Sequence, residues 1–220
     1  LLLAARQRRG KGFGALGETF RPATPGEAIV CARITDAFVR LERLDRFRDE
    51  LLTRAIERTG VERVLCLGDL LHAASGRTAA ALDAVDAWRA RHHSLAFVLV
   101  RGNHDTHAGD PPATWDMQCV DEPWNDPADE NPGENSGGNS LFTWRHKPGV
   151  TAGRYTLAGH IHPAVALNGG GRQRLTLPCF HFGPQLGILP AFGEFTGTAL
   201  MRREEGDRVY AVAGERVVKV

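Results

Sequence analysis

Two spacings of apolar residues alternate along the first half of the chain. Uninterrupted apolar runs, VERVLCL over 61–67 and LAFVLV over 95–100, predict short buried strands. Apolar residues at three- and four-residue spacing predict helices over about 49–58, ending at Gly60, and over 77–92. Strands alternating with helices favour an α/β fold with a largely parallel core sheet.

A further helix is predicted upstream of these elements. Thr24-Pro25-Gly26-Glu27 has the form of a capping box with proline at the first helical position. Val30, Ile34 and Phe38 follow at helical spacing. We therefore expect an amphipathic helix through this segment.

The second half is rich in short strand-like runs. We expect strands over 140–144, 154–159, 164–167, 174–177, 198–203, 208–213 and 216–220. The stretch 121–140 before them contains six acids, no Lys or Arg, and much Gly, Pro and Asn, which predicts a surface loop. No composition shift marks a boundary, so we interpret residues 1–220 as a single domain.

Composition narrows the class of protein. Hydrophobic residues make up 42%, enough for a packed core, and a net charge of +1 means that contact with nucleic acid must come from a local patch. Four scattered cysteines without a C-x-x-C pair indicate reduced thiols and a cytoplasmic protein. No apolar run approaches the roughly 20 residues that span a bilayer. The chain lacks an initiator Met and begins inside an apparent strand, so we expect that first strand to be incomplete.

Polar residues follow the predicted strands at the point where each one ends. The motifs are Gly-Asp at 68–69, Gly-Asn-His-Asp at 102–105, Arg-His at 145–146 and Gly-His-Ile-His at 159–162. Each alone is compatible with a turn, a helix cap or a surface pair. Their order after successive strands favours one site at the carboxyl edge of a sheet. Carboxylate, amide and imidazole ligands together suit Mn, Fe or Zn, and one Asp can bridge two ions about 3.5–4 Å apart.

With these motifs the sequence resembles the calcineurin-like metallophosphoesterases, whose pattern is Asp-x-His, Gly-Asp, Gly-Asn-His-Asp/Glu, His and Gly-His-x-His. The runs GNHDTHAGDPP (102–112), LAGHIHP (157–163), LPCF (177–180) and LPAFGEFTG (189–197) resemble the bacterial ligase-associated DNA damage response endonucleases. The resemblance implies two packed mixed β-sheets flanked by helices, an αββα sandwich. It also implies a metal-dependent phosphodiesterase acting on DNA in repair, with a DNA ligase and a helicase as partners.

The resemblance also implies roles for individual residues. Asp69 would bridge two metals, with manganese as the expected ion. Asn103, His146 and His160 would complete the second metal site, and His162 would belong to the first. His104 would protonate the leaving oxygen or stabilise the phosphoryl charge, with Asp105 orienting it.

The Asp-x-His motif is missing at the start of the chain. Aligning from the strand places Ala5 and Gln7 on the ligand positions, whereas aligning from Gly10-Lys11 places Arg6 and Arg8 there. We therefore expect an impaired first metal site, and Arg6 or Arg8 either pointing into it in place of the ion or lying on the surface. The run GFGALG at 12–17 matches a dinucleotide-binding motif, but no strand ends at its first glycine.

Three hypotheses on function stay open at this point. The first is a metal-dependent DNA phosphodiesterase, and a close variant has the same chemistry on small phosphodiesters or monoesters. The second is a catalytically impaired protein of the same fold, retained for binding a partner. The third and weakest is a dinucleotide-binding module.

Overall fold

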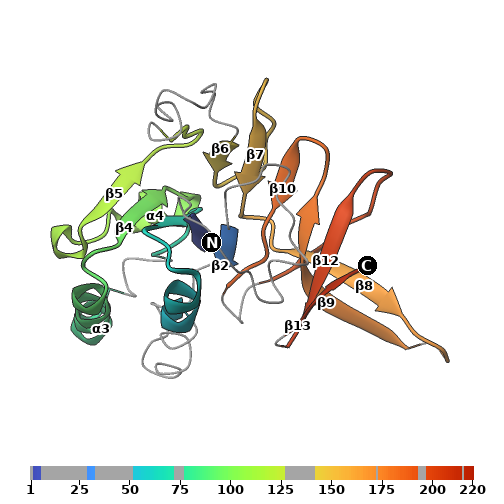
Figure 1. The fold of residues 1–220 in the computed structure, drawn as a ribbon, viewed down its shortest axis with the longest axis horizontal. Helices are drawn as coiled ribbons and strands as arrows, with labels where there is room; N and C mark the ends of the chain where they lie inside the picture. Colours follow the sequence, from blue (N-terminus) through green and yellow to red (C-terminus); the bar gives the residue numbers. More distant parts are fainter. Residues whose placement is uncertain are drawn as a thin grey trace.

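The structure is a computed structural model that describes residues 2–5, 29–32, 52–71, 77–126, 142–171, 173–192, 197–214 and 216–220, with backbone only for the first two segments. Two β-sheets pack face to face, with helices beside the first of them (Figure 1). The α/β fold with two mixed sheets that the sequence predicted is thereby confirmed. No helix in these segments is long and apolar enough to cross a membrane.

The first sheet has the strand order β2-β1-β3-β4-β5 within the described residues. Its strands are β1 (Leu2–Ala5), β2 (Ile29–Ala32), β3 (Arg63–Cys66), β4 (Ala96–Val100) and β5 (Met117–Val120). Strands β3, β4 and β5 are parallel, whereas β1 is antiparallel to both of its neighbours. Parallel strands end at one edge of a sheet, and the polar motifs after β3 and β4 therefore meet there.

Strand β2 lies where the sequence predicted part of a helix, and that prediction was wrong for these residues. Ile29–Ala32 pairs antiparallel with β1, from Leu2 opposite Ala32 to Ala5 opposite Ile29. The run IVCA is apolar and β-branched, so its spacing fits a short strand as well as one face of a helix. Pairing with β1 decides between the two, and the rest of the expected helix lies outside the described residues.

The direction of β1 also corrects the expectation for the missing ligand motif. Leu2 lies opposite Cys66 at the carboxyl end of β3, and Ala5 lies opposite Arg63 at its amino end. The chain therefore leaves β1 at the edge of the sheet away from Asp69. This geometry does not support Ala5 as a ligand position. The side chains of Arg6, Gln7 and Arg8 themselves lie outside the described residues.

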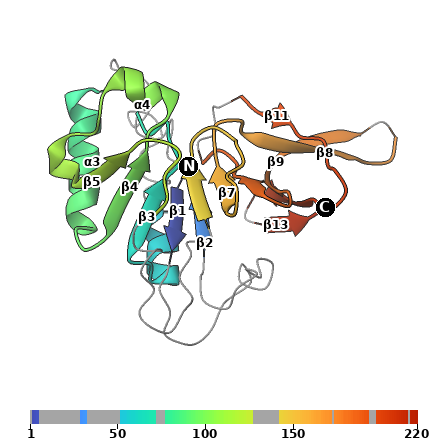
Figure 2. The ribbon, with the colours of Figure 1, turned by 90° about the horizontal axis from the view of Figure 1, so that it is seen from above.

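The second sheet has the order β11-β8-β9-β10-β7-β6, with β12 paired to β9 and β13 paired to β12. Its strands are β6 (Phe142–Arg145), β7 (Tyr155–Ala158), β8 (Pro163–Asn168), β9 (Arg174–Phe182), β10 (Leu186–Ile188), β11 (Ala199–Leu200), β12 (Arg208–Ala213) and β13 (Arg216–Lys219). Strands β6 and β7 are parallel, so they too deliver their following residues to one edge. The hairpin β8–β9 extends away from the first sheet (Figure 2).

Side chains of β3 alternate between two hydrophobic layers. Val64 and Cys66 pack against the helices on the outer face, which are α3 (Ala79–Arg91) and the helix that includes residues 52–59. Leu65 and Leu67 point to the other face and pack against the second sheet, where Trp144 and Leu157 meet them. Alternation along one strand thus joins the helix layer and both sheets.

The segment after β5 links the two sheets. Trp124 and Trp144 of β6 exchange two backbone hydrogen bonds, of 2.9 and 2.8 Å. Asp126 is 2% exposed and forms an ion pair with Arg63 of β3. These residues open the stretch expected as a surface loop, whose positions 127–141 lie outside the described residues. The described part of the stretch therefore contacts both sheets through Trp124 and Asp126, while Asp121 and Pro123 are exposed.

Candidate metal centre

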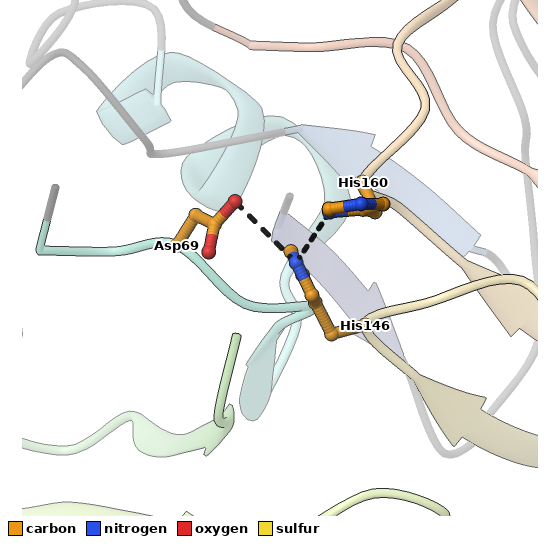
Figure 3. A group of neighbouring side chains, drawn as sticks. All are labelled: Asp69, His146 and His160. Atoms are coloured by element: carbon orange, nitrogen blue, oxygen red, sulfur yellow. Dashed lines mark hydrogen bonds and ion pairs between the residues drawn. The ribbon is translucent and has the colours of Figure 1, made fainter. Parts of the chain in front are cut away.

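Four candidate ligands lie where strands of both sheets end. Asp69 follows β3, and Asn103 begins the short helix α4 (Asn103–Ala108) directly after β4. His146 follows β6, and His160 follows β7. One ligand atom each of Asp69, His146 and His160 lie within 4.8 Å of one another (Figure 3).

The Nε2 atom of His146 is at the centre of this group. It lies 3.0 Å from Asn103 Oδ1 and 2.8 Å from His160 Nδ1. Asp69 Oδ2 is 3.4 Å away. Two ring nitrogens, an amide oxygen and a carboxylate oxygen thus converge on one small volume.

The protonation of His146 shows that this group fits a cation. Its Nδ1 lies 3.0 Å from the Leu67 carbonyl, which can only accept, so Nδ1 carries the proton. Burial lowers the pKa of His146 more than the nearby Asp69 carboxylate raises it, which favours the neutral ring with a lone pair on Nε2. That lone pair faces oxygen atoms of Asn103 and Asp69, which also present lone pairs. A bound divalent cation satisfies all of them at once.

The backbone adopts unusual conformations at the candidate ligands. Asp69, His160 and His162 have φ values of 56°, 64° and 56°. Among the described residues one other non-glycine position, Asp116, has a positive φ. Such conformations cost free energy and cluster at functional sites. Their concentration in these loops therefore indicates a functional site.

Two glycines let the ligand loops approach closely. A Cβ atom at Gly68, which has a φ of 82°, would collide with the ring of His146. A Cβ atom at Gly102 would collide with the carboxylate of Asp69 and lie 2.5 Å from its backbone nitrogen. The glycine that precedes each motif is therefore required by contact between the loops after β3, β4 and β6.

Asp105 holds two of these loops together. Its buried carboxylate accepts hydrogen bonds from the backbone N–H groups of Asp69 (2.5 Å), Leu71 (2.8 Å) and Gly102 (2.9 Å). Burial raises its pKa, and the three backbone hydrogen bonds act in the opposite direction. The resemblance implied that Asp105 orients His104, which stays a prediction, and its oxygens bond the main chain around Asp69.

The remaining candidate residues surround this group. His104 donates its backbone N–H to Asp69 Oδ1 at 3.1 Å, and its half-buried side chain lies in the first turn of α4. The Nδ1 of His162 lies 2.7 Å from the Gly197 carbonyl. His162 is not part of the Asp69–His146–His160 group, and its place in a separate first site stays a prediction.

Two contacts between a histidine and an acid were missed by the sequence analysis, and the first of them lies at the site. Glu122 accepts the backbone N–H of His146 at 2.8 Å. Its signal was an acid just after a strand, but β5 was itself not predicted because MQCV is short and mixed in character. The second is the buried pair of His181 and Asp207, 3.1 Å apart, which lies on β9 and beside β12.

Comparison with known proteins supports a nuclease-like architecture. No protein-family model and no curated protein sequence matches the chain. The crystal structure of Pseudomonas putida nuclease MPE matches it with a TM-score of 0.68 and 36% sequence identity, covering 87% of this chain and 86% of that chain. The α/β fold of two mixed sheets is thus shared with a solved nuclease. The chain belongs to the same family as that nuclease.

Proposed function

We propose that this protein is a metal-dependent phosphodiesterase that cleaves DNA. The observation that carries the proposal is the convergence of Asn103 Oδ1, His160 Nδ1 and Asp69 Oδ2 on the unprotonated Nε2 of His146. A nuclease that is 36% identical over most of both chains supports the same chemistry. The ligand group and the nuclease relative together favour a phosphodiester of DNA as the substrate.

Each residue of the site would have a separate role in the reaction. Asp69, Asn103, His146 and His160 would hold one divalent transition metal, which we propose to be manganese, with iron or zinc as alternatives, because mixed oxygen and nitrogen ligands suit these ions. Such an ion, when bound, neutralises phosphate charge and lowers the pKa of a coordinated water. His104 would donate a proton to the leaving oxygen. Asp105 would keep the backbone of Asp69 and Gly102 in place during the reaction.

The cellular setting is proposed from the resemblance of the sequence motifs. The runs at 102–112, 157–163, 177–180 and 189–197 resemble nucleases that are associated with a DNA ligase and helicase repair system. We propose the ligase and the helicase as partners of this protein. We also propose a cytoplasmic protein. Three described cysteines, Cys66, Cys119 and Cys179, are free thiols, which agrees with a reducing compartment.

A second candidate function is binding without efficient hydrolysis. It is favoured by the direction of β1, which places Ala5, opposite Arg63, at the edge of the sheet away from Asp69. The first metal site would then keep Asp69 and His162 from its expected ligands. Two ligands rarely hold an ion firmly against water, so hydrolysis that needs two ions would be slow.

Hydrolysis assays separate the two candidates. The metal-free protein is incubated with a labelled DNA oligonucleotide and Mn²⁺, with Asp69→Ala as the matched control. The proposed function predicts cleavage by the wild type and none by the variant. Retention of the oligonucleotide without cleavage would favour the second candidate, and equal cleavage by both proteins would indicate a contaminant.

A further inference from the structure

The main chain of His146 is held from outside the ligand group. One carboxylate oxygen of Glu122, Oε2, accepts the backbone N–H groups of His146 and Lys147, both at 2.8 Å. The carbonyl of His146 accepts the N–H of Gly159 at 3.1 Å, directly before the ligand His160. The imidazole donates through Nδ1 to Leu67, so every polar group of His146 other than Nε2 has a defined partner.

Glu122 reaches His146 from the first sheet. It lies two residues after β5, and Trp124 beside it pairs with Trp144 near the end of β6. Its neighbour Asp121 bonds Arg101 at 2.9 Å, and Arg101 directly precedes the Gly102 motif. The short segment 121–124 therefore connects the loop after β4, on the first sheet, with the loop after β6, on the second.

A carboxylate suits this position for a physical reason. Strand β6 ends at Arg145, so the next two N–H groups lie beyond the β6–β7 ladder and need acceptors. The Glu122 side chain is 22% exposed, and an ionised acceptor in such a setting makes shorter and stronger hydrogen bonds than a neutral one. One oxygen thereby fixes two consecutive peptide units and the direction in which the His146 ring leaves the backbone.

We propose that Glu122 is a positioning residue for the metal site, acting through His146. This inference rests on the proposed function, because it assigns Glu122 a part in holding the ion that the ligand group would bind. Partners that orient metal ligands typically account for about 10- to 100-fold in metal affinity when they are removed. A carboxylate that only ended a strand would change stability and leave metal affinity unchanged.

Three substitutions of Glu122 distinguish the effect of side-chain length from the effect of side-chain charge. Glu122→Ala removes the acceptor, Glu122→Asp keeps the charge but shortens the side chain, and Glu122→Gln keeps an oxygen at the same reach. Glu62→Ala, at an exposed glutamate just before β3 and at the opposite edge of the sheet, is the matched control. Each protein is freed of metal and titrated with Mn²⁺, and amide hydrogen exchange is measured on the metal-free form.

The proposal predicts that Ala and Asp lower Mn²⁺ affinity by about 10- to 100-fold, and that Gln retains more of it than either. The amides of His146 and Lys147 should exchange faster in the Ala and Asp variants than in the Gln variant or the control. Wild-type Mn²⁺ affinity in both the Ala and Asp variants would overturn the proposal, and so would equal losses in all three, Gln included. If Ala fails to fold, the comparison of Asp with Gln decides alone. A wild-type protein that binds no Mn²⁺ would contradict the proposed function, whereas faster exchange in the Ala variant would still support the anchoring of His146.

Discussion

At the scale of single residues, His104 is held in the site through its main chain. Its N–H donates to Asp69, while the side chain leaves the first turn of α4. The hydrogen bond to the ligand therefore survives removal of the imidazole. Replacing the imidazole therefore tests the chemical role of the side chain without removing the hydrogen bond to Asp69.

His104→Ala is expected to reduce DNA hydrolysis by about 100-fold or more, because general acid catalysis contributes on that scale. Metal content should stay at the wild-type level, since the backbone bond to Asp69 remains. Initial rates and elemental analysis on the same preparation check both parts. His93→Ala, at an exposed histidine just beyond α3, should leave both unchanged. Full activity in His104→Ala would remove this residue from the mechanism.

Gly102 is the second residue whose substitution has a definite expected outcome. The added methyl of Gly102→Ala would collide with Asp69 and with the His146 ring, whose Cε1 atom would lie 2.9 Å away. We expect a loss of about 1–3 kcal/mol in the free energy of unfolding, together with weaker Mn²⁺ binding. Gly170→Ala is the control, because its Cβ would meet nothing within 4 Å. Urea denaturation of both variants measures the difference, and equal stabilities would contradict the close packing of the two loops.

Residue by residue, the sequence identified the side chains that converge on His146 Nε2 better than the residues that support them. Asp69, Asn103, His146 and His160 were recognisable because each follows a strand within a short motif. The roles of Asp105 and Glu122 were not, because each acts through hydrogen bonds to backbone groups distant in sequence. Contacts of that kind have no local pattern.

At the scale of elements, strands with strong apolar runs were predicted well, and short mixed ones were not. The run 208–213 coincides with β12, and the expected strand over 95–100 with β4 to within one residue. Strand β2 was predicted as a helix, because four apolar residues fit either period and tertiary pairing decides. The direction of β1 could not be predicted either, since it depends on a partner strand and not on its own residues.

The C-terminal end of α3 shows how two physical effects compete at one histidine. A helix C-terminus favours positive charge, but His92 lies against Trp88, with ring centroids 4.7 Å apart. Burial lowers its pKa, as do Arg91 and Arg89, whereas Glu57 raises it. In the unfolded chain this histidine takes up its proton near pH 6.5, before it does so in the folded protein.

The free energy of unfolding of the metal-free protein should therefore fall as the pH drops through about 6.5, because the unfolded state binds the extra proton. Above about pH 7.5 His92 is neutral in both states and contributes no slope. His92→Gln should reduce the fall between pH 7 and pH 5. Urea denaturation across this range tests the sign, and a steeper fall in the variant than in the wild type would contradict it.

At the scale of the whole molecule, the candidate site joins the two sheets. Asp69 and Asn103 come from the first sheet, and His146 and His160 come from the second. Packing of Leu65 and Leu67 against Trp144 holds these edges together. A bound ion contacts only the assembled form, so Mn²⁺ is expected to stabilise the whole fold and not one loop alone.

The metal content of the purified protein is the most direct test of whether the ligand group around His146 holds a metal ion. Wild type and Asp69→Ala are loaded with Mn²⁺, dialysed and analysed for bound metal per chain. We expect about one tightly bound ion in the wild type and none in the variant, because among the described residues the assembled ligand group is the one around His146 Nε2. Two tightly bound ions in the wild type would contradict the impaired first site. Equal metal in both proteins would contradict the candidate metal centre itself.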